Sequence, residues 1–238
     1  SYLSVISKGA AVFILMILMF TIFKPLIHVW ENVVYVVALA TMFIGNLFAL
    51  RQQNMKRFLA FSSIAQAGFI LLGLITGTQL GTATIVYFVM IYIFSNLAAF
   101  GVVQAISLKT GKENMDDYNG LYRTNPKLSL VMMLALFSLA GIPPVAGFFG
   151  KFFLFTAAAS KGYYLLVFLA VVNVTISLYY YLLVIRAMFI RRNENPIPFF
   201  KNKLYMRLGL LITVIGILVL GLYSPLYDYI YELSSIFN

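Results

Sequence analysis

The chain has 238 residues, of which 62% are hydrophobic and only 10% charged, and its formal net charge is +10. Soluble globular domains carry about 25% charged residues, so this composition excludes an ordinary soluble domain and indicates an integral membrane protein. The basic residues are dispersed along the chain, which argues against a nucleic-acid-binding surface.

Residues that build redox and metal centres are nearly absent. The chain has no cysteine, which excludes disulfides, thiol chemistry and cysteine ligation of an iron–sulfur cluster by this chain. Its single histidine, His28, has no metal-ligand spacing around it, so we expect no metal site. The sequence starts at Ser1 without the pattern of a signal peptide, and we expect the numbering to begin inside a longer chain.

Apolar stretches of about 20 residues, long enough to cross a bilayer as helices, recur throughout the chain. They predict an all-α polytopic membrane protein with about seven transmembrane helices, one of them discontinuous. In chain order, we expect membrane spans at residues 1–23, 32–50, 58–77, 82–108, 128–160, 162–188 and 205–223.

The connections between these spans alternate in charge. Those after the second, fourth and sixth spans carry thirteen basic residues, whereas the opposite connections carry only Lys24 and Lys161. Lysine and arginine are enriched in cytoplasmic loops, so the thirteen are expected to face the cytoplasm. This orientation places the N-terminus in the cytoplasm and the C-terminus outside. The thirteen are Arg51, Lys56, Arg57, Lys109, Lys112, Arg123, Lys127, Arg186, Arg191, Arg192, Lys201, Lys203 and Arg207.

The fifth span, 128–160, is too long to be one straight helix. Its 33 residues would extend roughly 50 Å, beyond a bilayer core of about 30 Å. We expect a helix break at Gly141, Pro143, Pro144 and Gly147, because proline lacks the backbone N–H and glycine permits unusual backbone angles. In lipid, the freed backbone groups must be covered by protein or line a hydrated cavity, as in the ion sites of transporters.

Two basic residues, Lys8 and Lys151, remain inside expected spans. A lysine at the centre of a bilayer costs about 2.5–3.5 kcal/mol on insertion scales, so its retention calls for a reason. Lysine also exchanges its proton readily when it is removed from water, and we therefore predict that both are proton-relay residues. The alternative is that each side chain reaches the nearer interface, with Lys8 the more open to it.

All seven carboxylates are expected in loops or in the tail, so a buried partner for these lysines would lie in another chain or before Ser1. Polar side chains inside the spans are the other candidates for a water-filled path, although each alone is more often a helix–helix hydrogen bond. They are Gln66, Ser95, Asn96 and Ser138, with Asn173 and Ser177.

The stretch SLAGIPPVAGFFGKFFLF, residues 138–155, resembles the second broken helix of the antiporter-like subunits of respiratory complex I and of multi-subunit sodium/proton antiporters. Further stretches resemble the family of subunit N of NADH–quinone oxidoreductase. They are SVISKGAAVF (4–13), QNMKRFLAFSSIAQAGFILLG (53–73), SNLAAFGVV (95–103), NGLYRTNPKLSLVMM (119–133) and NVTISLYYYLLVIRAMF (173–189).

This resemblance implies a fourteen-helix fold with two inverted five-helix repeats, of which the chain would supply helices 8–14. Residues 1–31 would then end the first repeat, 32–188 would form the second with its break at 141–147, and 189–238 would hold a cytoplasmic loop, the last helix and an outer tail. Lys8 matches the family's central relay lysine, and Lys151 matches its lysine near the outward half-channel. Gln66 departs from the family, because many relatives carry histidine there.

The function implied is that of a proton-translocating subunit of NADH:quinone oxidoreductase, with no redox centre in this chain. FMN, iron–sulfur clusters and quinone are expected in other subunits, and the partners would be an adjacent antiporter-like subunit, small membrane subunits and the lipid bilayer. A bacterial inner membrane is the expected location. Two alternatives stay open: a subunit of a sodium/proton antiporter, and a non-pumping assembly or scaffold subunit.

Overall fold

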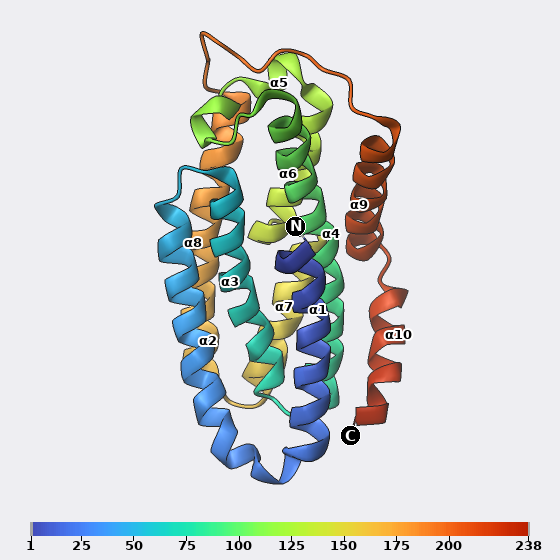
Figure 1. Cartoon of the computed structure of the whole chain (residues 1–238). Coiled ribbons are helices and arrows are strands. Elements are labelled where there is room, and N and C mark those ends of the chain that lie inside the picture. Colours follow the sequence, from blue (N-terminus) through green and yellow to red (C-terminus); the bar gives the residue numbers. More distant parts are fainter. Residues whose placement is uncertain (1, 238) are drawn as a thin grey trace.

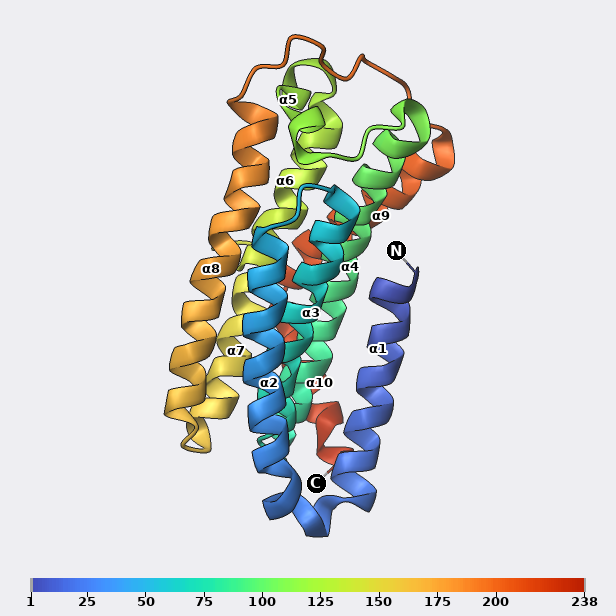
Figure 2. The ribbon, with the colours of Figure 1, turned by 60° about the vertical axis from the view of Figure 1, so that its left-hand side comes forward.

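The computed structural model describes residues 2–237 and shows a bundle of helices that run roughly along one direction (Figures 1 and 2). Short 3₁₀ and π turns connect or extend some of the α-helices. The α-helices are α1 (Tyr2–Ile17), α2 (Ile27–Leu50), α3 (Met55–Leu74), α4 (Gln79–Thr110), α5 (Leu121–Thr124), α6 (Pro126–Ala140), α7 (Ala146–Ser160), α8 (Tyr164–Phe189), α9 (Leu204–Leu222) and α10 (Pro225–Leu233).

The predicted all-α membrane architecture is confirmed. Within the described residues, six helical segments are long and apolar enough to cross a membrane. Two shorter apolar helices, α6 and α7, together occupy the predicted fifth span and are separated at the Gly/Pro segment. The chain therefore has one discontinuous span among continuous ones, as its sequence predicts.

The two ends of the bundle differ in charge. The connections at residues 51–54, 111–125 and 190–203 lie at the same end, which we call the basic end (Figures 1 and 2). The α1–α2, α3–α4 and α7–α8 connections lie at the opposite end. The predicted separation of basic residues along the sequence thus corresponds to a separation in space.

The start of the second span differs from the prediction. Helix α2 begins at Ile27 rather than near residue 32, so Glu31 lies within the helix and not in a loop. The Tyr163 hydroxyl donates a hydrogen bond to Glu31 Oε2 at 2.9 Å, and His28 Nδ1 lies 3.6 Å from Oε1. The side chain of His28 is 88% exposed. A short 3₁₀ turn containing Pro25 lets the chain reverse and begin the helix early.

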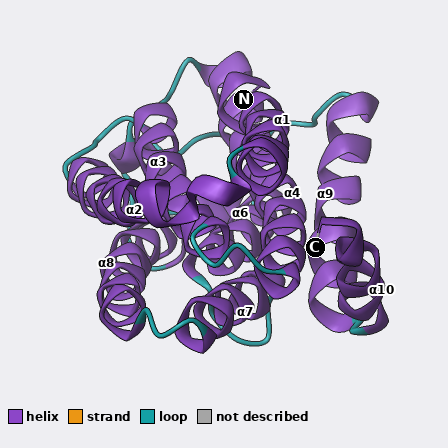
Figure 3. Ribbon diagram, turned by 90° about the horizontal axis from the view of Figure 1, so that it is seen from below, coloured by secondary structure: helices purple, strands orange, loops and turns teal. Residues whose placement is uncertain are grey.

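The predicted outer tail also contains a helix that the hydropathy pattern did not reveal. Helix α10 starts at Pro225, which suits the first helical position because its missing N–H is not needed there. Its Tyr227 ring stacks on Phe153 of α7, with centroids 4.1 Å apart, and packs edge-on against Tyr87 of α4. Figure 3 shows α9 and α10 together along one side of the bundle.

At the basic end, Glu113 fastens the loop after α4 to the start of α3. Its carboxylate pairs with Lys56 Nζ and accepts hydrogen bonds from Ser107 Oγ at 2.6 Å and Asn54 Nδ2 at 3.3 Å. Two backbone hydrogen bonds join the same segments. The bond from Lys56, followed by those from Ser107 and Asn54, lowers the pKa of Glu113 to about 2.

The lowered pKa of Glu113 predicts that the attachment of this loop is sensitive to acid. Because the pKa of Glu113 lies below its ordinary value of 4.5, the contacts of its carboxylate with Lys56, Ser107 and Asn54 (the Glu113 clamp) are fully formed above pH 4.5. They are lost as the pH falls towards about 2. Glu113→Gln should therefore raise the mobility of a spin label at Asp116→Cys at neutral pH, in a chain with no native cysteine. Glu194→Gln, at an exposed loop carboxylate, is the matched control. Equal mobility in the two variants would contradict the clamp.

Candidate functional site

The break between α6 and α7 leaves two carbonyl groups without helical donors. In a continuous helix, the oxygens of Leu139 and Ala140 would accept from the N–H groups of residues 143 and 144. Both of those residues are prolines, which have no N–H to give. The predicted break therefore creates two acceptors at a defined place inside the bundle.

Gly141 turns the chain at this point. Its φ of 85° lies in the left-handed region that suits glycine at a helix end. The N–H groups of Gly141 and Ile142 both donate to the oxygen of Phe137, at 3.0 Å. The oxygen of Phe137 is thus paired with backbone donors, whereas the oxygens of Leu139 and Ala140 are left for side-chain donors.

Lys151 supplies donors to both freed oxygens. Its Nζ lies 2.8 Å from the oxygen of Leu139 and 3.1 Å from that of Ala140. The residue is only 3% exposed, and its ammonium lies 4.9 Å from the centre of the Phe69 ring. Among the described residues, no carboxylate forms an ion pair with it. The structure therefore places this predicted lysine inside the protein rather than at an interface.

Gly147 allows α7 to return close enough for this contact. A Cβ at this position would lie 1.6 Å from the oxygen of Ser138, so only glycine fits. Lys151 follows one helical turn later and faces the same end of α6. The four predicted residues of the break and Lys151 thus form one local unit.

Gln66 connects the break to α3. Its Nε2 donates to the oxygen of Leu139 at 3.0 Å, the same oxygen that Lys151 contacts, and lies 3.4 Å from the Tyr181 hydroxyl. Tyr181 is fully buried. The predicted glutamine therefore lies in the site, although its partners are protein groups.

The remaining predicted polar residues divide into two sets. Ser95 Oγ donates to Ser138 Oγ at 2.8 Å and links α4 to the last turn of α6. Asn96 Nδ2 donates to the oxygen of Tyr92 at 3.1 Å, while its buried Oδ1 has no partner among the described residues. Among the residues that the structure describes, Asn173 makes no hydrogen bond to the helix break and instead accepts one at Oδ1 from Asn46 Nδ2 at 2.9 Å. The hydroxyl of Ser177 bonds within its own helix.

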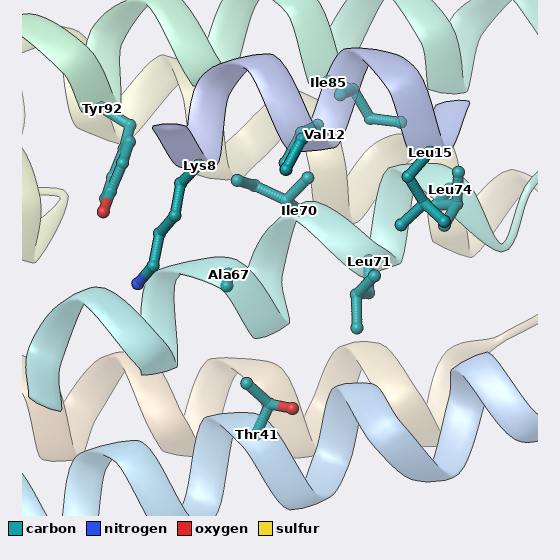
Figure 4. A pocket seen from close by; sticks show the side chains of 11 residues that line it. Lys8, Val12, Leu15, Thr41, Ala67, Ile70, Leu71, Leu74, Ile85 and Tyr92 are labelled. Atoms are coloured by element: carbon teal, nitrogen blue, oxygen red, sulfur yellow. The ribbon is translucent and has the colours of Figure 1, made fainter. Parts of the chain in front are cut away.

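Lys8 lies on the other side of α3. Its Nζ donates to the oxygen of Ser63 at 2.9 Å and to Ser63 Oγ at 2.7 Å. A cleft of about 240 Å³ lies beside it between α1, α2, α3 and α4, lined mainly by apolar side chains (Figure 4). Lys8 is partly buried and directed towards α3.

The two lysines thus contact groups that converge on one turn of α3. Gln66 donates to the oxygen that holds Lys151, and Ser63, about one turn earlier on α3, holds Lys8. The sequence analysis missed Ser63 and Tyr181. Its available signal was the polar run SSIAQ, residues 62–66, within an otherwise apolar helix.

Comparisons with known proteins give consistent matches. Residues 2–177 match the family model described as NADH:quinone oxidoreductase/Mrp antiporter, TM. The chain is 56% identical over 229 residues to NADH-quinone oxidoreductase subunit N of Phocaeicola vulgatus, covering 96% of this chain and 48% of that protein. The chain therefore spans about half the length of this curated relative.

Solved structures show the same architecture. A chain of respiratory complex I from Thermus thermophilus superposes with a TM-score of 0.73 at 35% identity, over 82% of this chain and 44% of that one. A chain of the Mrp complex from a Dietzia species superposes with a TM-score of 0.86 at 23% identity, over 95% of this chain and 50% of that one. The second likeness supports the fold alone.

The close approach at Gly147 predicts a selective effect of adding one methyl group. Gly147→Ala should lower the midpoint of thermal unfolding, because its Cβ would collide with the backbone oxygen of Ser138. Gly209→Ala in α9 is the matched control, because no atom lies within 4 Å of its Cβ and alanine is the better helix former by about 1 kcal/mol. Thermal unfolding in detergent measures both, and an unchanged midpoint for Gly147→Ala would contradict the packing described.

Proposed function

The chain belongs to the NADH:quinone oxidoreductase/Mrp antiporter membrane family, and we propose that it translocates protons through Lys8 and Lys151 as a membrane subunit of a proton-translocating NADH:quinone oxidoreductase. The observation that carries this proposal is the environment of Lys151. Its ammonium is buried and is held by two backbone oxygens rather than by a carboxylate.

This environment can hold a proton without trapping it. The oxygens of Leu139 and Ala140 are at the C-terminal end of α6, where the helix dipole favours a positive charge. Burial opposes the same charge, because it removes the ammonium from water. A carboxylate in contact would add a full opposite charge and strengthen the hold on the proton, whereas backbone dipoles stabilise it less. The site therefore suits a group that must repeatedly gain and lose its proton.

The polar groups on α3 provide the proposed connection between the two lysines. Lys8 would be the relay in the middle of the membrane and Lys151 the group nearer the outward half-channel. Gln66 does not itself titrate, so its role would be to orient the oxygen and the donors around Lys151. The unpaired Oδ1 of Asn96 is an acceptor of the kind that ordered water satisfies.

The wider assignments form part of the same proposal. Residues 1–31 would end one repeat, 32–188 would form the second, and 189–238 would complete the chain. The basic end would face the cytoplasm of a bacterium, with the C-terminus outside. FMN, iron–sulfur clusters and quinone would reside in other subunits, and adjacent antiporter-like and small membrane subunits would be the partners.

A sodium/proton antiporter subunit is the second candidate, because the description of the matching family model names both NADH:quinone oxidoreductase and Mrp antiporter. Purification of the native complex distinguishes the two, because flavin and iron–sulfur absorbance should accompany only the oxidoreductase. A non-pumping assembly subunit is the remaining alternative, and it requires that both lysines tolerate neutral replacement in an intact complex.

We predict that Lys151→Ala or Lys8→Ala lowers NADH-driven proton uptake into vesicles by about tenfold or more, because loss of a positioned proton-transfer group slows the transfer step by about 10²–10⁴-fold. Lys161→Ala, at an exposed lysine of the α7–α8 connection, should leave uptake unchanged. Quenching of a pH-sensitive dye measures uptake, and native gels verify assembly.

The variant Lys151→Arg keeps the positive charge at this position but removes the ability to release a proton. Arginine can donate to the same two oxygens, but it does not release its proton at neutral pH. The variant should assemble, yet translocate as poorly as the alanine variant. Normal uptake by an assembled Lys151→Arg or Lys151→Ala complex would refute the relay.

A further inference from the structure

A second cleft, of about 480 Å³, lies at the basic end, away from the two relay lysines. It is formed by the first turns of α6, the chain before α9 and the upper part of α9. Its lining consists of Asn125, Pro126, Lys127, Leu128, Val131, Phe199, Phe200, Lys201, Asn202, Arg207, Leu210, Leu211 and Val214. We propose that this cleft binds one anionic phospholipid, with its phosphate at the basic rim and an acyl chain along the apolar wall.

The rim carries positive charge without compensation. Lys127, Lys201 and Arg207 line the cleft, and no carboxylate among the described residues does. Within residues 2–237, none of these three side chains forms an ion pair, although Lys56 and Arg191 elsewhere at this end do so. Three unpaired cations around one cleft favour a phosphate-bearing group.

The apolar wall continues from the rim down the helices. On α6, Val131 lies one turn below Lys127, and on α9, Leu211 lies one turn below Arg207. Both helices begin at the basic end and run in the same direction from it (Figure 1). Each therefore presents a cation near the headgroup level and hydrophobic residues deeper in the membrane. Leu211 is 54% exposed, so this wall is open to lipid.

Hydrogen bonds of Asn125 fix the backbone that forms the floor of the cleft. Asn125 is buried, donates through Nδ2 to the oxygen of Pro198 at 3.1 Å, and accepts at Oδ1 from the N–H of Phe200 at 3.4 Å. These bonds hold the chain before α9 against the start of α6. Phe200 and Lys201 thereby line the same cleft as Lys127.

A lipid accounts for the two halves of the cleft together. Inorganic phosphate would use the cations but leave the hydrophobic wall unused, and a zwitterionic lipid would bring its own positive charge to a basic rim. A bound lipid would join α9, which packs at the side of the bundle, to the helix that leads into the break. The proposal does not depend on proton transfer by the lysines.

The test uses the assembled complex in phosphatidylcholine vesicles that contain phosphatidylglycerol with a photoreactive acyl chain. Mass spectrometry should locate the label on peptides that line the cleft. Combined replacement of Lys127, Lys201 and Arg207 by glutamine should reduce this labelling by about tenfold or more, given the contribution of each cation near a lipid surface. The control replaces Arg51, Arg57 and Arg192 by glutamine, with the same change in charge at the same end, and should retain the labelling.

Three further arms identify the occupant. Val131→Trp fills the apolar wall without changing charge and should also reduce labelling, whereas photoreactive phosphatidylcholine should label the cleft weakly. Added inorganic phosphate should not displace the lipid. Displacement by phosphate, equal loss in the two glutamine variants, strong labelling by phosphatidylcholine, or a wild-type cleft left unlabelled because another subunit covers it would each overturn the proposal.

Discussion

The structure depends on one requirement: backbone oxygens that two adjacent prolines deprive of donors must be paired inside an apolar bundle. Leaving a buried carbonyl unpaired costs about 1–3 kcal/mol, and two such groups lie side by side at the end of α6. The ammonium of Lys151 satisfies both and at the same time finds partners for itself. The break and the lysine therefore stabilise each other.

That mutual dependence organises the surrounding packing. Lys151 reaches the freed oxygens only because α7 returns within contact of α6 at Gly147. Gln66 adds a second donor to the oxygen of Leu139, which ties the break to the polar turn of α3. The same turn carries Ser63, the partner of Lys8. A local gap in one helix is thus connected, through side-chain contacts, to a lysine on the first helix.

Sequence reasoning could predict the spans, the helix break and the burial of a lysine beside it, because hydropathy, proline chemistry and glycine permissiveness act locally. It could not predict that Ser63 and Tyr181 complete the network, because their partners lie 55 and 115 residues away along the chain. The misplacement of Glu31 has a related cause. A charged residue at the end of an apolar run looks like a loop, although a partner such as the Tyr163 hydroxyl lets it remain in a helix.

The ion pairs of the described residues lie away from Lys8 and Lys151. Within the described residues, the three ion pairs involve residues in the connections or near the helix ends, and none includes Lys8 or Lys151. A contacting carboxylate would dominate the protonation of a buried amine, because electrostatic interactions strengthen where water is excluded. Without one, each lysine is held by hydroxyls and backbone oxygens, and its proton affinity stays sensitive to charges that appear farther away. Such sensitivity is what a relay needs if it is to respond to charge changes in neighbouring subunits, and a fixed local ion pair would suppress it.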